Sequence, residues 1–262
     1  MIRALYTAAS GMSAQQLNLD TIANNLANSS TTGFRQLRLE FQDMVYQNLV
    51  TPGAAQSQST VSAGLQIGLG TKSAATEVIN TQGSLNETDN PLDLAIEGTG
   101  FFQVQRPDGT IAYTRAGQFQ LDMNGNIVNS SGYPLQPQIT IPADAQQVTI
   151  AQDGTVSYTL PNQTAVQQAG QIQLANFQNP AGLNSLGGGL YEPTDASGTA
   201  TVGVPGGPDG MGSLLQGYVE QSNVSIVNEF INLIQAQRGY EANSKVVTAA
   251  DNMYQQVNNL AK

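Results

Sequence analysis

The first part of the chain, residues 2–28, carries apolar side chains at alternating spacings of three and four. This spacing is typical of a helix that pairs with another helix, and no proline interrupts it. The positions that follow the spacing are Ile2, Leu5, Ala9, Met12, Gln16, Leu19, Ala23 and Leu26. Gly11 is the weak position, because glycine costs about 1 kcal/mol relative to alanine in a helix. We expect the helix to stop at Thr32-Gly33, since glycine readily takes the positive φ of a helix end.

The last part, residues 222–261, repeats this spacing and also lacks proline. One stripe consists of Ile226, Phe230, Leu233, Gln237, Tyr240, Ser244 and Val247, and its neighbour of Val246, Ala250, Met253, Val257 and Leu260. The backs of both predicted helices carry few charges: Asp20 in the first, and Lys245 and Asp251 in the second half of the other. Because solvated helix backs normally carry charges, we expect the two helices to pair and to be covered by neighbouring subunits. An ordinary helical hairpin packed on a globular core is the alternative.

Between the helices, residues 46–75 are rich in Gly, Ala, Ser and Gln, with a single charge at Lys72. Such a composition favours an extended connector or a flexible loop. Within it, "GLQIGLG" alternates apolar residues with glycine, which allows a short strand.

From about residue 76 to residue 220 the apolar residues alternate with period two, as in β-strands. Three pairs of alternating runs flank Asp108-Gly109, Asn124-Gly125 and Asp153-Gly154, which are strong hairpin signals. "QIQLANF" at 171–177 predicts another strand, and the glycine-rich residues 180–213 are expected to be the least regular. The pattern predicts a compact all-β domain, sandwich- or barrel-like, inserted between the terminal helices.

The expected fold is therefore α + β and multidomain. Residues 1–34 and 222–262 form a helical core domain in which the heptad helices pair as in a coiled coil. Residues 35–84 form a connector with an extended linker or hairpin at 46–75, and residues 85–221 form a β-rich outer domain.

The composition changes the picture of the surface. Charged residues make up 11% of the chain, against about 25% in ordinary soluble domains. The polar residues are mostly amides, with 52 Asn and Gln against 28 charged side chains. Amides are buried at a packed interface at lower cost than ions, which favours a surface covered by other protein. A secreted monomer with few charges is the alternative.

Several classes of function are excluded or disfavoured. The net charge of −10, with nine scattered basic residues, argues against nucleic-acid binding. The absence of Cys and His removes disulfides, thiol chemistry, the usual general base and the commonest metal ligand. No apolar run approaches the roughly 20 residues of a membrane span, and the N-terminus lacks the apolar core of a signal peptide. We expect no catalytic residue, no cofactor and no bound metal.

Two weak chemical motifs are present. Asp122, Asn124 and Asn126 are spaced like calcium ligands, but Ile127 stands where an EF-hand requires glycine, and a hairpin turn explains the motif better. Three acids at 89, 93 and 97 (Asp89, Asp93 and Glu97) could pair for glycoside hydrolysis, but nothing distinguishes them from ordinary turn acids.

The segment "LDTIANNLANSSTTGFR", from residue 19 to residue 35, resembles the N-terminal signature of the flagellar basal-body rod and hook proteins. The matching positions are Asn24, Asn25, Leu26, Ala27, Asn28, Thr31, Gly33, Phe34 and Arg35. The C-terminal segment with "EQSNVS" and "QRGYEANSK" resembles the second signature of that family. Its matching positions are Ser222, Asn223, Val224, Gln237, Arg238, Tyr240, Glu241, Asn243 and Ser244. "GTGFFQV" and "YTRAGQF" are similar to segments of the family's β domain.

The resemblance implies a helical tube whose terminal helices line the inner core and whose β domains face outward. The implied partners are further copies of the chain, proximal rod and hook subunits at the two ends, surrounding ring proteins and a rod cap. It further implies torque transmission, export by the flagellar type III apparatus, and a place in the basal body across the periplasm, without nucleic acid or stable membrane insertion. The length and the segment at 46–75 are most similar to distal-rod members; another rod or hook subunit, or a peptidoglycan hydrolase, is the alternative.

Two expectations concern particular residues. Asn is a poor helix former, so we interpret the three asparagines at 24, 25 and 28 as amides that serve polar packing in an assembly. We also expect residues 46–75 to stiffen the assembly by locking neighbouring subunits. The connector positions assigned to this role are Tyr46, Pro52, Gly53, Gly64, Leu65, Ile67 and Gly68.

Overall fold

The computed structural model describes residues 2–50, 55–56, 59–60, 64–161, 165–207 and 210–260. The chain folds into two compact units. The helical unit comprises residues 1–27, 37–77 and 225–262, and the β unit comprises residues 28–36 and 78–224. The mixed α + β composition expected from the sequence is confirmed. The finer division into three parts, with boundaries at 34, 84 and 221, stays a prediction.

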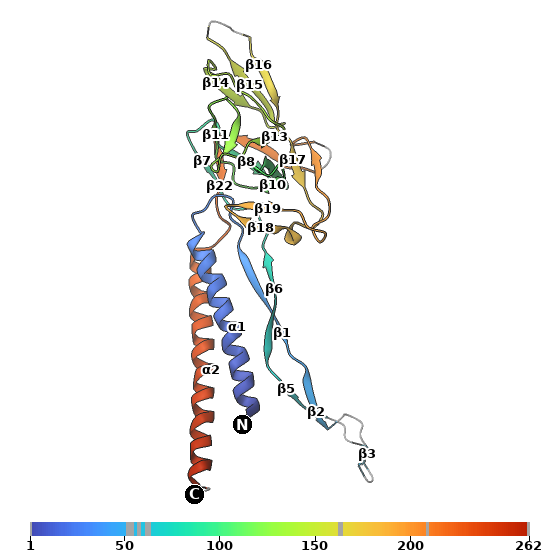
Figure 1. The fold of residues 1–262 in the computed structure, drawn as a ribbon, viewed down its shortest axis with the longest axis vertical. Helices are drawn as coiled ribbons and strands as arrows, with labels where there is room; N and C mark the ends of the chain where they lie inside the picture. The colour runs from blue at the N-terminus through green and yellow to red at the C-terminus, as the bar shows by residue number, and fades with distance from the viewer. Residues whose placement is uncertain are drawn as a thin grey trace. The chain divides into compact units, whose positions relative to one another are not determined.

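Two long helices form the backbone of the helical unit, α1 (Ile2–Ala27) and α2 (Ile226–Leu260). They run antiparallel, because Gly11 faces Asn243 while Gln15 faces Gly239, and Figure 1 shows them side by side. The prediction that the first helix stops at Thr32-Gly33 is wrong. The helix ends at Ala27, and a turn closed by the Thr31 N–H on the Asn28 carbonyl follows.

The seam between the helices coincides with the predicted stripes only in part. In α1, the predicted positions Leu5, Met12, Leu19 and Leu26 are half-buried, but those at 9, 16 and 23 are exposed, and Ala8, Gln15 and Ile22, one residue earlier, are buried or half-buried. In α2, the predicted positions Leu233, Ser244, Val247 and Ala250 are buried or half-buried, and the unpredicted seam positions are Glu229, Ala236, Gly239, Asn243 and Tyr254. The side chains of Ile2 and Leu260 lie outside the described part of the chain.

The reason for the difference is steric. A Cβ at Gly11 would lie 2.7 Å from Asn243 Nδ2, and a Cβ at Gly239 would lie 3.3 Å from Gln15 Cδ. The helices therefore approach on glycines and amides, where the backbones come closest. The larger apolar residues, Ile226 and Phe230 among them, are left exposed.

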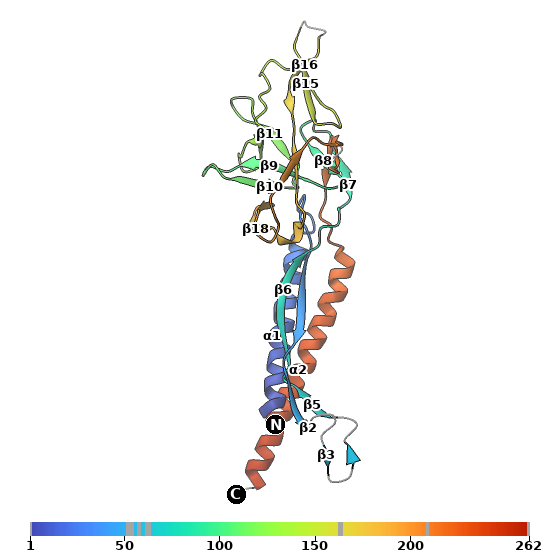
Figure 2. The same ribbon diagram turned by 90° about the vertical axis from the view of Figure 1, so that its right-hand side faces the viewer.

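A narrow β ribbon accompanies the helices in the same unit (Figure 2). Its paired strands are β1 (Leu37–Asp43) with β6 (Thr71–Val78), β2 (Tyr46–Val50) with β5 (Leu65–Gly68), and β3 (Ala55–Gln56) with β4 (Ser59–Thr60). The short strand predicted in "GLQIGLG" is confirmed as β5, whereas the sequence pattern did not predict β1 and β6. Gly70 lies against α1, since a Cβ there would clash with Ser10 Oγ.

The β unit contains sixteen described strands and one short 3-10 helix. The strands of its first half are β7 (Leu85–Glu87), β8 (Leu94–Glu97), β9 (Phe101–Gln105), β10 (Ile111–Thr114), β11 (Phe119–Leu121), β12 (Ile127–Asn129), β13 (Leu135–Gln136) and β14 (Gln147–Ile150). The second half contains β15 (Thr155–Thr159), β16 (Gln167–Gln171), β17 (Leu174–Asn176), η1 (Pro180–Gly182), β18 (Asn184–Gly187), β19 (Leu190–Glu192), β20 (Thr201–Gly203), β21 (Ser213–Gln216) and β22 (Tyr218–Glu220).

The largest sheet has the order β18-β19-β10-β9-β17-β20, with β13 also paired to β9. The three predicted hairpins are confirmed as β9/β10, β11/β12 and β14/β15, with glycines of positive φ at 109, 125 and 154. Residues 180–213, expected to be the least regular part of the β domain, contain the short strands β18, β19 and β20. There, three successive glycines of positive φ, Gly187–Gly189, provide the turn of a hairpin.

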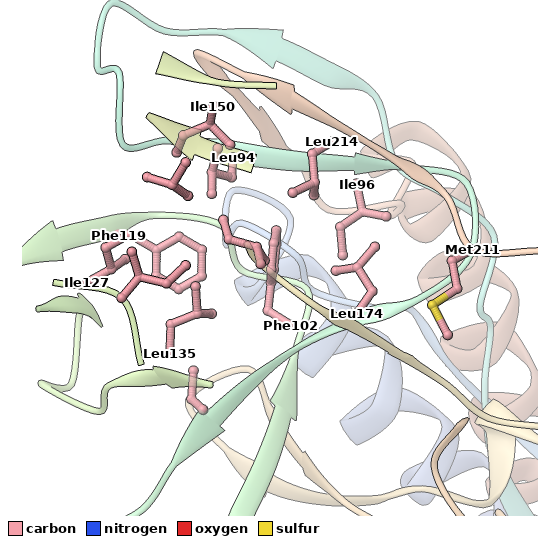
Figure 3. Close-up of a cluster of buried hydrophobic side chains, with 14 of the residues drawn as sticks. Leu94, Ile96, Phe102, Phe119, Ile127, Leu135, Ile150, Leu174, Met211 and Leu214 are labelled. Carbon is pink, nitrogen blue, oxygen red and sulfur yellow. The ribbon is translucent and has the colours of Figure 1, made fainter. Parts of the chain in front are cut away.

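The hydrophobic core lies in the β unit. Phe102 and Phe119 meet edge to face with ring centroids 5.1 Å apart, and Leu94, Ile96 and Leu174 pack around them (Figure 3). These side chains come from four strands, β8, β9, β11 and β17, so the core ties the sheets of the unit together. None of the described helices is both long enough and apolar enough to cross a membrane.

Candidate functional site

The helical unit buries very little apolar surface of its own. Among the described residues, 31 hydrophobic side chains are buried, but only five belong to this unit: Ala8, Ala14, Ile22, Ala236 and Ala250. Ile22 is therefore its one buried apolar side chain larger than alanine. By contrast, 18 of the 24 exposed large hydrophobic residues lie in this unit. Exposed apolar side chains in this number mark the unit as a candidate interaction site.

The exposed apolar residues are concentrated near the start of α2. We define the α2 patch as Ile226, Val227, Phe230, Ile231 and Ile234, with exposed fractions from 47% to 68%. At 100° per residue, Val227 and the buried Ala236 point in opposite directions around the helix. The apolar face of α2 is thus turned away from α1, and nothing within the described unit covers it.

One of the asparagines serves the fold of the chain itself. Asn25 is 1% exposed, and its Nδ2 donates to the Leu37 carbonyl at 2.8 Å. In return, the Leu37 N–H donates to Asn25 Oδ1 at 2.9 Å. The amide therefore pairs with the start of β1 as a neighbouring strand would. Asn28 instead accepts from the Thr31 hydroxyl in the turn after α1, and Asn24 is exposed.

The other N-terminal signature residues lie nearby in the sequence but in different settings. Leu26 is half-buried and Ala27 is exposed at the end of α1. Gly33 has a φ of +68° and donates its N–H to the Glu220 carbonyl at 2.8 Å, so its positive φ serves a turn and not a helix end. Phe34 is half-buried.

Three segments of the β unit meet at one place, which we call the junction: residues 33–36, 79–83 and 220–223. Asn223 is its centre, because Nδ2 donates to the carbonyls of Ile79 and Thr81, both at 2.9 Å. Its Oδ1 accepts the Gln36 N–H at 2.7 Å. One side chain thus cross-links all three segments, which lie where the chain enters and leaves the β unit.

A buried charge cluster closes the junction. Glu220 is fully buried, with one carboxylate oxygen 2.7 Å from Arg35 and the other 3.3 Å from Arg115. The Gly83 N–H donates to Glu220 Oε1 at 2.9 Å. Arg115 also donates to the Gly98 carbonyl at 2.6 Å and lies over the Phe101 ring. We call these three charged residues the Arg–Glu–Arg cluster.

Burial dominates the electrostatics of this cluster. It lowers the pKa of Arg115 to about 10, and the negative charge of Glu220 offsets part of that effect. Buried ion pairs of this kind are costly to break, because each lost partner leaves an uncompensated charge. Sequence reasoning identified Arg35 but missed Glu220 and Arg115, although both stand in segments that resemble the family.

The C-terminal signature residues are divided between the junction and α2. At the junction, Ser222 is buried, and its hydroxyl accepts the Val224 N–H at 3.3 Å. In α2, Asn243 is half-buried against Gly11 and Ser244 is half-buried, whereas Gln237 and Tyr240 are exposed. The last two signature residues, Arg238 and Glu241, form an exposed ion pair at 3.0 Å.

The connector residues lie in the β2–β5 part of the ribbon. Tyr46 and Gly68 are register partners, and a Cβ on Gly68 would touch the Tyr46 ring at 3.4 Å. Leu65 is exposed, while Gly64 and Ile67 are half-buried. Two of the assigned positions, Pro52 and Gly53, lie outside the described residues.

The weak chemical motifs are explained by turns. The Asp122 carboxylate accepts the backbone N–H groups of Asn124 and Asn126, both at 2.8 Å, as in the predicted hairpin turn. Asp93 is buried and accepts from Thr88 Oγ1 and Asn90 Nδ2, both at 2.9 Å. Within the part of the chain that the structure describes, no group of three or more acidic side chains could hold a metal ion.

Three family models match the chain. The model described as flagella basal body rod protein matches residues 5–35, and the flagellar hook protein FlgE/F/G D1 domain matches residues 95–158. The model for the C-terminal part of the flagellar basal body rod FlgEFG proteins matches residues 215–260. The three matches cover α1, the hairpins of the β unit, and α2 with the strands before it.

Curated relatives match over their full length. The flagellar basal-body rod protein FlgG of Buchnera aphidicola (subsp. Acyrthosiphon pisum) is 48% identical over 99% of this chain and 100% of its own. FlgG of Caulobacter vibrioides is 49% identical over 99% of both chains, and FlgG of Bacillus subtilis is 41% identical over 100% of both. The chain belongs to the flagellar basal-body rod protein family.

Proposed function

We propose that this protein is a structural subunit of the flagellar distal rod. It polymerises into a rigid helical tube that acts as a drive shaft, transmits torque and leaves a channel for exported flagellar proteins. The observation that carries this proposal is the helical unit, in whose described part 18 large hydrophobic side chains are exposed and one is buried. Such a unit gains its hydrophobic stabilisation only when neighbouring copies cover it. The full-length similarity to FlgG proteins supports the same role.

In this proposal the paired helices behave as a coiled coil whose outer faces pack on other subunits. The β domain, sandwich- or barrel-like, forms the outer part of the tube. In the assembled subunit, residues 1–34 and 222–262 form the helical core domain, residues 35–84 the connector, and residues 85–221 the outer domain. The ends of the tube contact proximal rod and hook subunits, and its outside contacts ring proteins and, during growth, a rod cap. The subunit reaches this place across the periplasm through the flagellar type III apparatus.

Residues 46–75 are proposed to brace neighbouring subunits and to make the rod straight. The paired strands β2 and β5 support this role, because a hydrogen-bonded ribbon resists bending better than a flexible linker. Exposed Tyr46 and Leu65 provide apolar contacts along it. Deleting residues 46–75 and imaging the assembled structures tests the proposal. We expect curved or flexible tubes, and straight, stiff tubes would contradict the bracing role.

Assembly itself is tested with two matched substitutions. Phe230→Asp places a charge in the α2 patch, and Met123→Asp places the same charge at a residue of the β unit that is 98% exposed. We expect the wild type and Met123→Asp to sediment as tubes and Phe230→Asp to remain monomeric. Failure of the wild type to assemble under conditions that polymerise a FlgG relative would contradict the proposed function.

Two alternative functions have direct tests. Labelling the subunit in intact basal bodies distinguishes a distal-rod position from a proximal-rod or hook position. Incubating purified protein with peptidoglycan tests hydrolysis, and we expect no release of soluble fragments. The turn roles of Asp93 and Asp122, whose carboxylates are occupied by local donors, support that expectation.

A further inference from the structure

Beside the α2 patch, the helical unit carries a second open surface. A shallow groove of about 490 Å³ lies between α1 and the β1–β6 ribbon. Its lining residues are Leu17, Asp20, Thr21 and Asn24 from α1, Leu37 and Leu39 from β1, and Ser73–Thr76 from β6. Apolar and small side chains dominate this lining, and Asp20 is its single charged residue. Asp20 is also the one charged residue between residues 4 and 34 of the sequence.

The outer face of α2 carries an apolar row of similar length, and the charge at its end is positive where that of the groove is negative. Val227, Ile231 and Ile234 follow one another at spacings of four and three along that face, and Arg238 continues the row one turn later. Arg238 is the first basic residue of α2, and its side chain is 77% exposed. The first and last residues of the apolar row are seven positions apart, as are Leu17 and Asn24 on the α1 side of the groove. Each therefore extends about 10 Å along its helix.

We propose that the outer face of α2 docks into the groove of a second copy of this chain, where Arg238 pairs with Asp20. This inference rests on the proposed function, because it names the surfaces that join subunits in the polymer. Ile234 enters the apolar part of the groove, and the guanidinium of Arg238, one turn further along α2, meets the Asp20 carboxylate. Arg238 is available for this contact, because its present pair with Glu241 is solvent-exposed and contributes little stability.

The geometry of the contact also explains the form of the assembly. The two surfaces are different parts of the chain, so each copy offers one patch and one groove. Such a heterologous contact repeats from copy to copy, and it builds an open helical filament where the rotation between copies does not close a ring. The α1–α2 seam is not disturbed, since the docking face of α2 lies opposite the side that packs on α1.

Charge reversal tests the pairing in the full-length chain. Asp20→Lys and Arg238→Glu each place like charges at the proposed contact, and we expect each to raise the critical concentration for assembly about tenfold or more. The double variant, Asp20→Lys with Arg238→Glu, restores the attraction and returns the critical concentration to within about threefold of the wild type. As the control, Arg106→Glu in the β unit reverses a half-buried, paired arginine outside both proposed surfaces and leaves assembly unchanged.

Cross-linking tests the proximity directly, because the chain contains no cysteine. Asp20→Cys and Arg238→Cys are made in separate chains, mixed, assembled and treated with a short bismaleimide. A cross-linked dimer in the mixture, and not with either variant alone, is the expected result. If the wild type assembles but neither the rescue nor the mixed dimer is found, the docking is wrong and another partner covers the patch. If the wild type does not assemble at all, the proposed function fails first.

Discussion

Asn25 and Leu37 exchange two hydrogen bonds, from Asn25 Nδ2 to the Leu37 carbonyl and from the Leu37 N–H to Asn25 Oδ1, at 2.8 and 2.9 Å. A side-chain amide near the end of a helix thus supplies the donor and acceptor that a strand would otherwise supply. The two hydrogen bonds to main-chain groups of β1 offset the poor helix propensity of Asn at this position. The pair joins the end of α1 to the start of the ribbon.

The first prediction concerns this pair. Asn25→Ala leaves the Leu37 N–H and carbonyl without their side-chain partners, so the start of β1 opens more readily. In assembled protein we expect amide exchange in the peptide that contains Leu37 to accelerate about tenfold or more, from the loss of one or two buried hydrogen bonds. Thr248→Ala is the control, because the Thr248 hydroxyl donates within α2, to the Lys245 carbonyl. Equal exchange in the two variants would contradict the role of Asn25.

The second prediction concerns the Arg–Glu–Arg cluster. Glu220→Gln keeps the shape of the side chain but leaves two buried arginines without a counter-charge. We expect the free energy of unfolding of the β unit to fall by about 3–5 kcal/mol. Arg106→Gln breaks the solvent-accessible pair of half-buried Arg106 with exposed Asp108 in the same unit and should cost less than about 1 kcal/mol. Urea unfolding followed by tyrosine absorbance compares the two; similar midpoints would show that the cluster is not what holds the junction.

The third prediction compares a glycine required only by its positive φ with a glycine required also by the close approach of another backbone segment. At Gly33, with φ +68°, a Cβ would lie 2.6 Å from the Ala116 backbone nitrogen. At Gly132, with φ +82°, a Cβ would meet nothing within 4 Å. Gly132→Ala should therefore cost about 1–2 kcal/mol from backbone strain alone, and Gly33→Ala roughly 2–5 kcal/mol from strain plus the clash. Thermal unfolding of both variants measures the difference, and a Gly33→Ala protein as stable as Gly132→Ala would refute the close approach.

The fourth prediction concerns acid. The backbone N–H of Asn126 is the main cause that holds the pKa of Asp122 below its ordinary value of 3.8, and the Thr155 N–H acts similarly on the pKa of Asp153. Because the folded-state pKa values are depressed, this contribution to stability is complete above the ordinary pKa and is lost as the pH falls through the folded-state value. We expect NMR titration to place the pKa of Asp122 below 3.8. Its hairpin should loosen only below that pH, and an ordinary or raised pKa would contradict the turn geometry.

The fifth prediction concerns the free monomer. The described part of the helical unit buries one apolar side chain larger than alanine, so its helices are weakly held before assembly. In dilute monomer we expect little amide protection over residues 5–28 and strong protection in β9 and β10, which border the core. After assembly, both regions should be protected. Strong protection of residues 5–28 in the monomer would show that the unit is stable without neighbours.

The local features of this protein are determined by the sequence alone. Heptad spacing without proline is sufficient to predict α1 and α2, because helix periodicity is a property of neighbouring residues. Asp-Gly and Asn-Gly turns are sufficient for three hairpins, since only those residues take the required φ cheaply. The two signature segments identify the family. What could be predicted is therefore what depends on residues a few positions apart.

The tertiary structure decided which side of each element is used. Gly11 and Asn243 are 232 positions apart, and their close approach adds glycine and amide positions to the helix seam that the predicted apolar stripe does not contain. Glu220 pairs with Arg35 and Arg115 because the fold brings together three segments that are far apart in the sequence. Which glycine, amide or charge becomes buried depends on how closely distant backbones approach. For that physical reason, Ile226 and Phe230, which the sequence assigns to pairing within the chain, remain exposed on α2, where they can meet another copy.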